Sequence, residues 1–599
     1  MAKRHSWKAI WRYWKSALRG SARYDHAVLA VLAVAVGIVV AYATILFRLA
    51  ILGAQALGFG VGSEIMVEHV RALPWWQVVL VPTAGGLVVA VLLRTIMPTG
   101  RTHGVAEVIE ANALADGRLS LRAGVTSALT VATALGTGSS SGREGPAVHL
   151  GATLASWIAQ KLHLVPGVAR TLLGCGVAAA VAASFNAPIA GVFFALEVVM
   201  GHYALHAFAP IVIASVTATI VSRIHLGDFP AFIVPDYAIV SAWEFPAFVL
   251  LGVLTAGVAV IFMRAILTVE DAAGRLPLPR WALPPIAGLI VGVIALAVPE
   301  VLGVGYEATD NALKQNYGLA FLIVLVVAKT AATAICLGCR YGGGVFSPAI
   351  YLGATTGGAF GLIAASLFPD LASGAGVYAI VGMGAVASAV LGAPISTILI
   401  VFELTGDYSI TIAVMIAAAI ASLITGLFFK SSFFYLQLER RGLSLEGGRV
   451  RYLLKARQVR GLMMRGVVTL RPEALLGEVK ALLLTVPTGK IPVTDARGEL
   501  VGVICHSEIG PEHLHADADE TLPAGEIARA NPLHVTAGES LDHALGLFES
   551  SGEDFLPVVN DSRNRIFVGM LNRLDVLEAY NNALVAVQAE GTTTRVETR

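Results

Sequence analysis

Charge and cysteine are both scarce in this chain. Asp, Glu, Lys and Arg make up 14% of its 599 residues, and the formal net charge is +1. Ordinary soluble domains carry about 25% charged residues, so this is not a soluble composition. A charge balance near zero offers no electrostatic attraction for a nucleic acid. The four cysteines do not make a disulfide framework. We therefore predict neither a secreted disulfide scaffold nor a nucleic-acid-binding protein.

Patterns typical of catalytic and metal sites are missing as well. Cys336 and Cys339 have no second pair of metal ligands nearby, and in an apolar segment small packing residues are the better interpretation. No nucleophile–base pair and no phosphate-binding loop stands at a supported spacing. The sequence therefore predicts no enzyme activity, no metal site and no required cofactor.

Apolar sequence is what the chain has in abundance. Hydrophobic residues make up 56% of it. Uncharged runs recur that come close to or exceed the roughly 20 residues needed to cross a bilayer core. We therefore expect an integral, multi-pass protein of the plasma (inner) membrane. The uncharged runs are Ala27–Phe47, Ala72–Leu93, Thr171–Leu196, Phe245–Met263, Trp281–Pro299, Tyr341–Pro369, Leu371–Phe402 and Tyr408–Phe429.

The N-terminal segment, residues 1–24, is rich in Lys and Arg. Because positive residues stay on the cytoplasmic side of membrane proteins, this segment is predicted to be cytoplasmic. A secretory signal with a cleavage site at Ala41–Ala43 is the alternative. The apolar run is too long for a signal peptide and further spans follow, which favours a true span.

The membrane region contains an internal repeat. Gly142–Ala152 and Gly344–Ala354 share the pattern Gly-x-x-x-Pro-Ala-x-x-Leu-Gly-Ala. Further along, Gly176–Glu197 matches Gly382–Glu403 with the same internal spacing of Gly, Pro and Glu. Two matching pairs in the same order make a chance match improbable. The segment 25–442 is therefore predicted to be one transmembrane domain built from two related halves.

The halves run from about 25–225 and 240–440. If both termini are cytoplasmic, an odd number of crossings in each half makes the repeats inverted in the bilayer. In such folds broken helices point their N-termini at ions near the midplane. The predicted fold is therefore an all-α polytopic membrane domain with inverted repeats and broken helices. Helix packing by small residues is the alternative explanation for the repeated Gly and Ala.

Glu144 is the residue that helix packing does not explain. An ionisable side chain at membrane depth is expensive and usually functional. The neighbouring glycines leave backbone N–H groups accessible, and Pro146 suits the first turn of a helix. A helix N-terminus of this kind is an anion site. Glu144 thus places a carboxylate where an anion would sit, which predicts a gate.

Four segments together resemble the CLC family of chloride channels and chloride–proton exchangers. They are Gly142–Pro146, Phe185–Gly191, Gly344–Pro348 and Val401–Gly406. The resemblance covers nearly the whole membrane region. It implies a homodimer in the lipid bilayer, with one separate pathway for chloride and other small anions in each subunit.

The resemblance also implies roles for single residues. Glu144 corresponds to the gating glutamate, which competes with chloride for the external site. The backbone amides of Arg143 to Gly145 would line the anion pathway. Those of Val345 and Phe346 would line it as well.

His103 is the first departure from the family pattern. It stands where the family has a serine whose hydroxyl binds the central anion. An imidazole can donate a hydrogen bond to chloride, and its reference pKa of about 6.5 suits a pH sensor. The alternative is a histidine at a helix end, bonded to backbone or water. The sequence leaves both interpretations open.

Val198 is the second departure. Exchangers of the family usually carry a proton-transferring glutamate at this place, directly after the residue matched by Glu197. Valine cannot bind a proton, so the usual relay has lost its acid. This predicts a passive, gated and pH-sensitive chloride channel. A chloride–proton antiporter that uses Glu197 or water is the alternative, although Glu197 is expected to be a structural carboxylate. A non-transporting membrane scaffold would not require Glu144.

The third departure concerns the inner-gate tyrosine of the family. Counting back from Arg440 places it on Phe434, with Tyr435 beside it. If Phe434 is the matching residue, the central anion loses a phenol hydroxyl. The register is uncertain by one residue, so Tyr435 is the alternative. Both also suit an aromatic anchor at the membrane interface.

The C-terminal third resembles a pair of CBS domains on the cytosolic side, with an α/β fold. Residues 455–510 are predicted to form the first and residues 525–582 the second, followed by a disordered tail at 590–599. CBS pairs often bind adenine nucleotides. Only Asp575 keeps the ribose-binding carboxylate, so dimerisation and coupling to the gate are the favoured roles. The segment 447–457 is predicted to be a linker.

Overall fold

The computed structural model divides the chain into two compact units, one ending at Leu443 and one beginning at Ser444. The residues that it describes are 26–97, 99–203, 205–227, 232, 237, 239–429, 431–443, 448–486, 489–505 and 520–589. The predictions for residues 1–24 and 590–599 lie outside this range.

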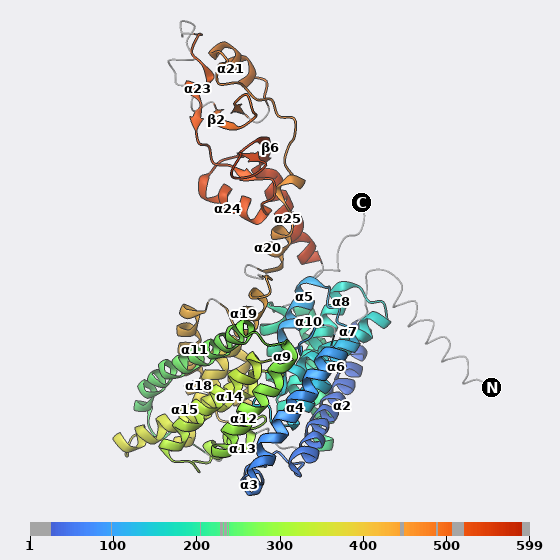
Figure 1. Cartoon of the computed structure of the whole chain (residues 1–599), viewed down its shortest axis with the longest axis vertical. Helices are drawn as coiled ribbons and strands as arrows, with labels where there is room; N and C mark the ends of the chain where they lie inside the picture. Colours follow the sequence, from blue (N-terminus) through green and yellow to red (C-terminus); the bar gives the residue numbers. More distant parts are fainter. Residues whose placement is uncertain are drawn as a thin grey trace, which may run out of the picture. The chain divides into compact units, whose positions relative to one another are not determined.

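The first unit is helical, and its two halves run through the same order of elements. In Figure 1 the blue-to-cyan helices of the first half lie beside the green-to-yellow helices of the second. The first half contains α2 (His26–Phe59), α3 (Val67–Ala72), α4 (Trp75–Thr95), α5 (Val105–Leu114), α6 (Leu121–Gly136), α7 (Glu144–Lys161), α8 (Pro166–Phe185), α9 (Pro188–Phe194) with the π-helix η1 (Ala195–Met200), and α10 (Leu205–Leu226).

The second half repeats this series without a counterpart of α3. Its helices pack on those of the first half, as α12 does on α4 and α17 on α9. A short helix, α19 (Phe433–Glu439), follows it. The second half contains α11 (Phe245–Arg275), α12 (Leu283–Ala297), α13 (Tyr306–Leu313), α14 (Leu319–Gly338), α15 (Phe346–Leu367), α16 (Ala375–Leu391), α17 (Pro394–Thr405) and α18 (Tyr408–Phe428), with the 3-10 turns η2 (Ala242–Glu244), η3 (Arg280–Ala282) and η4 (Pro299–Val301) between them.

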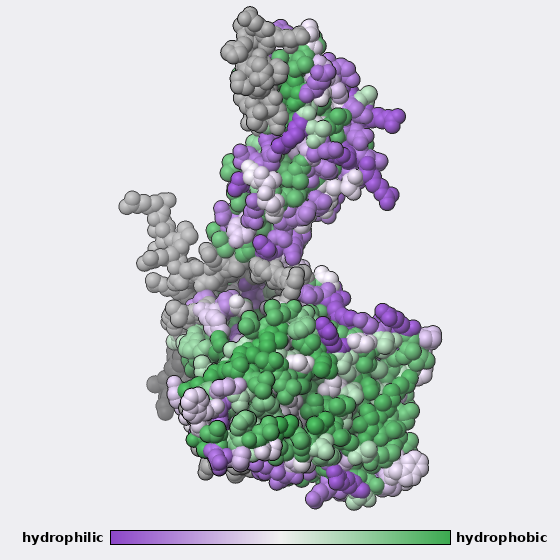
Figure 2. Space-filling view, turned by 90° about the vertical axis from the view of Figure 1, so that its left-hand side faces the viewer, coloured by the Kyte–Doolittle hydropathy of each residue, from purple (hydrophilic) through white to green (hydrophobic). Residues whose placement is uncertain are grey.

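The surface of this unit is apolar over a broad band. Among the described residues, nine helices are long and apolar enough to cross a membrane. Large side chains such as Leu46, Leu423 and Leu427 are exposed, and Figure 2 shows hydrophobic residues covering the side of the unit. Such a continuous apolar face suits lipid rather than water. Helices also satisfy their own backbone hydrogen bonds, which lipid requires. The chain is therefore a multi-pass membrane protein.

Small residues let the central helices approach closely. A Cβ atom on Gly151 of α7 would lie 2.5 Å from the carbonyl oxygen of Gly176 in α8. In the second half, a Cβ atom on Gly353 of α15 would lie 2.6 Å from the Cα atom of Met383 in α16. The repeated glycines therefore do pack helices, as the alternative interpretation held, and they do so at matching places in both halves.

The second unit contains two copies of one α/β arrangement. The first sheet has the order β1-β2-β3 and the second β4-β5-β6, with β4 parallel to β5 and the other pairs antiparallel. The elements are α20 (Gly448–Lys455), η5 (Val459–Gly461), α21 (Leu476–Leu483), β1 (Lys490–Thr494), β2 (Leu500–Cys505), α23 (Ala524–Ile527), β3 (Arg529–Ala530), β4 (Val535–Thr536), α24 (Leu541–Ser551), β5 (Phe555–Val559), β6 (Phe567–Asn572) and α25 (Arg573–Ala589).

The two copies hold each other through backbone and side chains. The Leu500 amide donates to the Arg565 carbonyl (2.9 Å), and Glu499 and Ile566 form a β-bridge. Glu553 accepts hydrogen bonds from Lys490 and from Arg529. The predicted fold class is therefore confirmed for both parts of the chain.

One sequence prediction is wrong. The segment 447–457 was expected to be a linker, but residues 448–455 form α20, which packs on α24 and α25. The turn-forming glycines at the start of the segment favoured a loop. The apolar Leu454 behind them is fully buried and belongs to the hydrophobic core that this helix shares with its neighbours. Tertiary packing therefore overrides the local signal.

Candidate functional site

Two helix N-termini meet in the middle of the first unit. α7 begins at Glu144 and α15 begins at Phe346, at matching places in the two halves. Gly142 and Gly344, just before these helices, exchange backbone hydrogen bonds of 2.7 and 2.8 Å. The first N–H groups of a helix have no partner within it and carry partial positive charge. Two such ends side by side form a favourable environment for an anion.

The Glu144 carboxylate lies at this junction and is 1% exposed. Its Oε1 atom accepts a hydrogen bond from the Tyr306 hydroxyl (2.7 Å). Its Oε2 atom accepts one from the Ser347 hydroxyl. The guanidinium of Arg143 lies 3.9 Å from Oε1. The first turn of α7 thus carries a buried carboxylate held by groups from α13 and α15.

A cavity of about 320 Å³ opens beside this junction, and it is called the main cavity below. It gathers most of the predicted site residues, although they come from α7, α15 and α19 and from the residues just before α5 and α15. The predicted residues that line it are His103, Glu144, Gly145, Val345, Phe346 and Phe434.

Phe434 and Tyr435 differ in their position relative to the main cavity. Phe434 lines it and is 6% exposed. Tyr435 does not line it. Of the two residues considered for the inner gate, the one without a hydroxyl therefore faces the cavity.

Four arginines line the main cavity: Arg101, Arg340, Arg440 and Arg441. Arg441 donates to Glu107 (2.8 Å) and Arg440 to Glu270 (2.9 Å). Within the described part of the chain Arg340 forms no ion pair. Guanidinium groups around a cavity raise the local concentration of small anions.

His103 lines the main cavity just before the first turn of α5. Its Nε2 atom lies 2.8 Å from the Thr99 hydroxyl, and its ring stands edge-on to that of His149, with centroids 5.1 Å apart. His149, on α7, is 1% exposed, and its Nε2 atom has no hydrogen-bond partner among the described residues. Both interpretations of His103 keep support, because it is bonded at a helix end and also faces the cavity.

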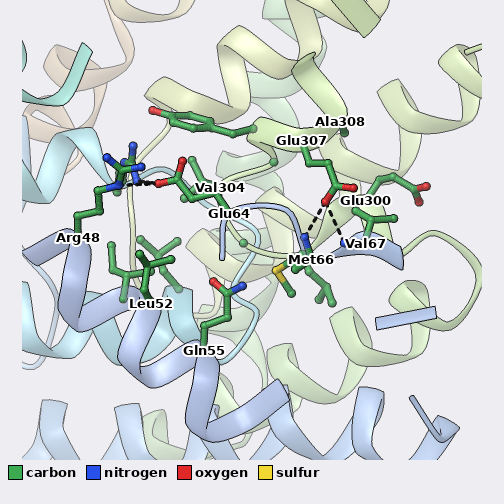
Figure 3. Close-up of a pocket in the computed structure, with 17 residues that line it drawn as sticks. Arg48, Leu52, Gln55, Glu64, Met66, Val67, Glu300, Val304, Glu307 and Ala308 are labelled. Atoms are coloured by element: carbon green, nitrogen blue, oxygen red, sulfur yellow. Dashed lines mark hydrogen bonds and ion pairs between the residues drawn. The ribbon is translucent and has the colours of Figure 1, made fainter. Parts of the chain in front are cut away.

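The Arg143 side chain points away from the main cavity into a small pocket of about 40 Å³, called the Glu64 pocket below. Arg143 donates to Glu64 (2.5 Å), which also accepts from Arg48 (2.9 Å). The Arg143 guanidinium lies over the Tyr306 ring, 4.7 Å from its centroid. Figure 3 shows Arg48 reaching Glu64 across this pocket. The Arg143 guanidinium thus lies between Glu64, Tyr306 and Glu144 and does not line the main cavity.

Val198 is 3% exposed within η1. The neighbouring Glu197 accepts hydrogen bonds from the backbone amides of Ile395 (3.1 Å) and Ser396 (2.8 Å), at the start of α17. Its counterpart Glu403 accepts from two amides at the start of α9, each at 2.8 Å. Each half thus caps a helix of the other half with a carboxylate. Glu197 is thus hydrogen-bonded to backbone amides, and its structural role stays a prediction.

Asp575 lies in the first turn of α25, directly after β6. It is half-buried, and the side chain of nearby Asn572 accepts a hydrogen bond from the Leu574 amide (2.9 Å). The corresponding Glu508 of the first copy lies outside the described residues. Among the described residues no group of three or more His, Cys, Asp or Glu side chains could hold a metal ion.

Sequence reasoning missed Tyr306, Ser347 and Glu64. Ser347 stands inside the repeated Gly-x-x-x-Pro motif, so a comparison of the two copies could have found it. Tyr306 is 162 residues from Glu144 along the chain. We see no local pattern that would have indicated Tyr306 or Glu64.

Comparisons with known proteins agree with this arrangement. The family model described as voltage gated chloride channel matches residues 85–426, and the CBS domain model matches residues 459–509 and 524–582. A ClcB-like chloride channel protein of Ralstonia nicotianae is 34% identical over 386 residues, which cover 64% of this chain and 90% of that protein.

Other relatives carry different names. Chloride channel protein CLC-e of Arabidopsis thaliana is 33% identical over 61% of this chain and 54% of its own length. The H(+)/Cl(-) exchange transporter ClcA of Cronobacter sakazakii is 33% identical over 48% of this chain and 64% of its own length.

Solved structures share the fold. A slow cyanobacterial Cl-/H+ antiporter superposes with a TM-score of 0.63 at 23% identity, covering 70% of this chain and 98% of that one. A eukaryotic CLC transporter gives 0.60 at 21% identity and covers 91% and 97%. The family model spans more than half of the chain and the fold agrees with it. The chain therefore belongs to the voltage gated chloride channel family.

Proposed function

We propose that the protein is a passive, gated chloride channel, with one anion pathway per subunit and Glu144 as its gate. The observation that carries this proposal is the position of Glu144. Its carboxylate is buried at the junction of two helix N-termini, at the end of an arginine-lined cavity. A negative group there competes with any anion that the same N–H groups would bind.

The absence of an acid at Val198 supports passive conduction over exchange. Coupled exchange requires a group that accepts and releases a proton in each cycle. Val198 cannot do this, and Glu197 is engaged with the start of α17 through two backbone hydrogen bonds. Chloride movement without a coupled proton follows its own electrochemical gradient.

A chloride–proton antiporter is the second candidate, and the histidine pair favours it. Both His103 and His149 can bind a proton, and their rings lie edge-on in contact. His103 lines the main cavity, and His149 lies behind it as a buried residue of α7. Their charged neighbours are Glu107, Arg101 and Arg441. A proton route through these rings would replace the missing glutamate.

The reversal potential of the wild-type protein separates the two candidates. In proteoliposomes with a chloride gradient, a channel gives a potential set by chloride alone and moves no proton uphill. Vesicles without protein, under the same chloride gradient, serve as the control. Uphill proton movement driven by chloride would contradict the channel. Its loss in the His103→Ser, His149→Gln double variant would identify the histidine route.

We further propose a homodimer with the N-terminus and the CBS pair in the cytoplasm. The family resemblance and the basic N-terminal segment support this. The particle mass in detergent tests the dimer, and protease access to inside-out and right-side-out vesicles tests the orientation. Adenine nucleotide binding near Asp575 is a weaker proposal, tested by calorimetry with ATP on the full chain and on Asp575→Asn.

A further inference from the structure

We propose that the hydroxyls of Tyr306 and Ser347 form a latch that holds the Glu144 carboxylate in the closed position. Opening then requires both hydrogen bonds to break. This inference rests on the proposed role of Glu144 as the gate, and it assigns what keeps that gate shut.

Each oxygen of the carboxylate is held by one hydroxyl. Tyr306 donates to Oε1 (2.7 Å) and Ser347 donates to Oε2. Their exposed fractions are 1% for Glu144, 8% for Tyr306 and 2% for Ser347. Hydrogen bonds to an ionised acceptor are roughly twice as strong as neutral ones. Two hydroxyl donors on one carboxylate therefore favour the position in which both bonds are formed.

The Tyr306 hydroxyl is held in place by its surroundings. The loop before it is tied down by Lys329, a fully buried residue whose Nζ atom donates to the carbonyls of Val301 and Gly303 (3.0 Å each). Gly305, directly before Tyr306, has a φ of 87°, which a side chain rarely adopts. A fixed donor loses little entropy when it binds Glu144.

The latch lies between the two cavities. Tyr306 and Arg143 line the Glu64 pocket, whereas Glu144 lines the main cavity. The hydrogen bond from Tyr306 to Glu144 thus joins a residue that lines the Glu64 pocket to a residue that lines the main cavity. Arg143 contacts both Tyr306 and Glu64, and it therefore connects the latch to the ion pairs of the Glu64 pocket.

Ser347 supplies the second hydroxyl from the first turn of α15. The residue that matches Ser347 in the first copy of the repeat is Gly145, and glycine has no side chain that could donate a hydrogen bond. A buried serine inside the motif Gly344–Pro348 is not needed for helix packing, because an alanine would fill nearly the same space. The Ser347 hydroxyl instead donates a hydrogen bond to Oε2 of Glu144.

The test is chloride efflux from proteoliposomes at pH 7 for Tyr306→Phe, Ser347→Ala and Ser347→Cys. The cysteine variant keeps the volume and loses the strong donor. We expect each variant to raise the chloride flux roughly tenfold, because one charge-assisted bond of the closed state is lost. Tyr341→Phe is the matched control, since this buried tyrosine donates to the Pro82 carbonyl (2.7 Å) and does not bond Glu144. The control should leave the flux unchanged.

Glu144→Ala separates failure of the latch from failure of the gate. If Glu144→Ala leaves the flux unchanged, the proposed gate is wrong and the latch falls with it. If Glu144→Ala raises the flux while the hydroxyl variants behave like Tyr341→Phe, the latch is wrong and the gate stands. On the Glu144→Ala background, Tyr306→Phe and Ser347→Ala should add nothing. A further rise there would show that the hydroxyls act elsewhere, which overturns the latch.

Discussion

The two halves of the membrane unit agree in some places and differ in others. Glu197 and Glu403 are equivalent, and each caps a helix of the opposite half with two backbone hydrogen bonds. The starts of α7 and α15 are equivalent in backbone but not in side chains, because one carries Glu144 and the other carries Phe346 and Ser347. Where the halves agree they build the fold. Where they differ they carry the residues of the proposed gate and of the proposed latch.

The largest effect is expected from removing the charge that only the first half carries. Glu144→Gln should raise chloride flux on the order of 10- to 100-fold at pH 7, because the closed state loses two charge-assisted bonds. The rise in flux on acidification should flatten as well. Flux from proteoliposomes between pH 5 and pH 8 measures both effects. If the variant kept the flux and the pH profile of the wild type, the side-chain difference between the two halves would have no effect on gating.

The shared carboxylates should behave as a matched pair. Glu197→Gln and Glu403→Gln should each destabilise the protein by about 1–3 kcal/mol, because an amide group would then face a backbone donor. Thermal unfolding in detergent measures this, and the reversal potential should stay as in the wild type. If Glu197→Gln alone changed the reversal potential, the two carboxylates would not be equivalent and Glu197 would belong to a proton route.

A smaller effect is expected at His103, which has no histidine counterpart in the second half. Burial lowers the pKa of His103 below its ordinary value of about 6.5. His103→Ser should therefore reduce the pH dependence of flux below about pH 6.5 roughly twofold, because protonation no longer adds a charge beside the main cavity. Thr99→Val, which removes the hydroxyl next to the ring, is the control for local packing. If His103→Ser changed neither the flux nor the anion preference, His103 would have a purely structural role.

The smallest effect is expected in the second unit, where Glu553 joins the two CBS copies. Partial burial raises the pKa of Glu553, but the hydrogen bonds and charges of Lys490 and Arg529 outweigh it and hold the pKa below its ordinary value. The pair therefore stabilises the fold above the unfolded pKa of about 4.5, and this contribution is lost as the pH falls through the lower folded value. Glu553→Gln should cost about 0.5–1 kcal/mol at pH 7 and less at pH 3. Thermal unfolding of the full chain at both pH values measures the difference, and an equal cost at both would exclude the charge effect.

Much of the fold and part of the site follow from local patterns. Uncharged runs of spanning length predict the helices, and the repeat predicts two related halves. Gly142–Pro146 predicts a helix that begins at a carboxylate, because glycine, proline and the position of the acid act within one turn. Val198 is visible for the same reason, since its place is counted from a neighbouring motif. The failure at α20 has the opposite cause, because that helix is stabilised by partners more than 80 residues away.

The sequence by itself determined that the chain spans a membrane, that its halves repeat, and that Glu144 stands at a helix N-terminus. These properties depend on composition, period and short spacings. Only the tertiary structure decided that Tyr306 and Ser347 hold Glu144, that the Arg143 side chain binds Glu64, and that Phe434 rather than Tyr435 faces the main cavity. Hydrogen bonds between distant residues depend on how helices pack and on the direction of each side chain. Neither is encoded in a pattern of a few neighbouring residues.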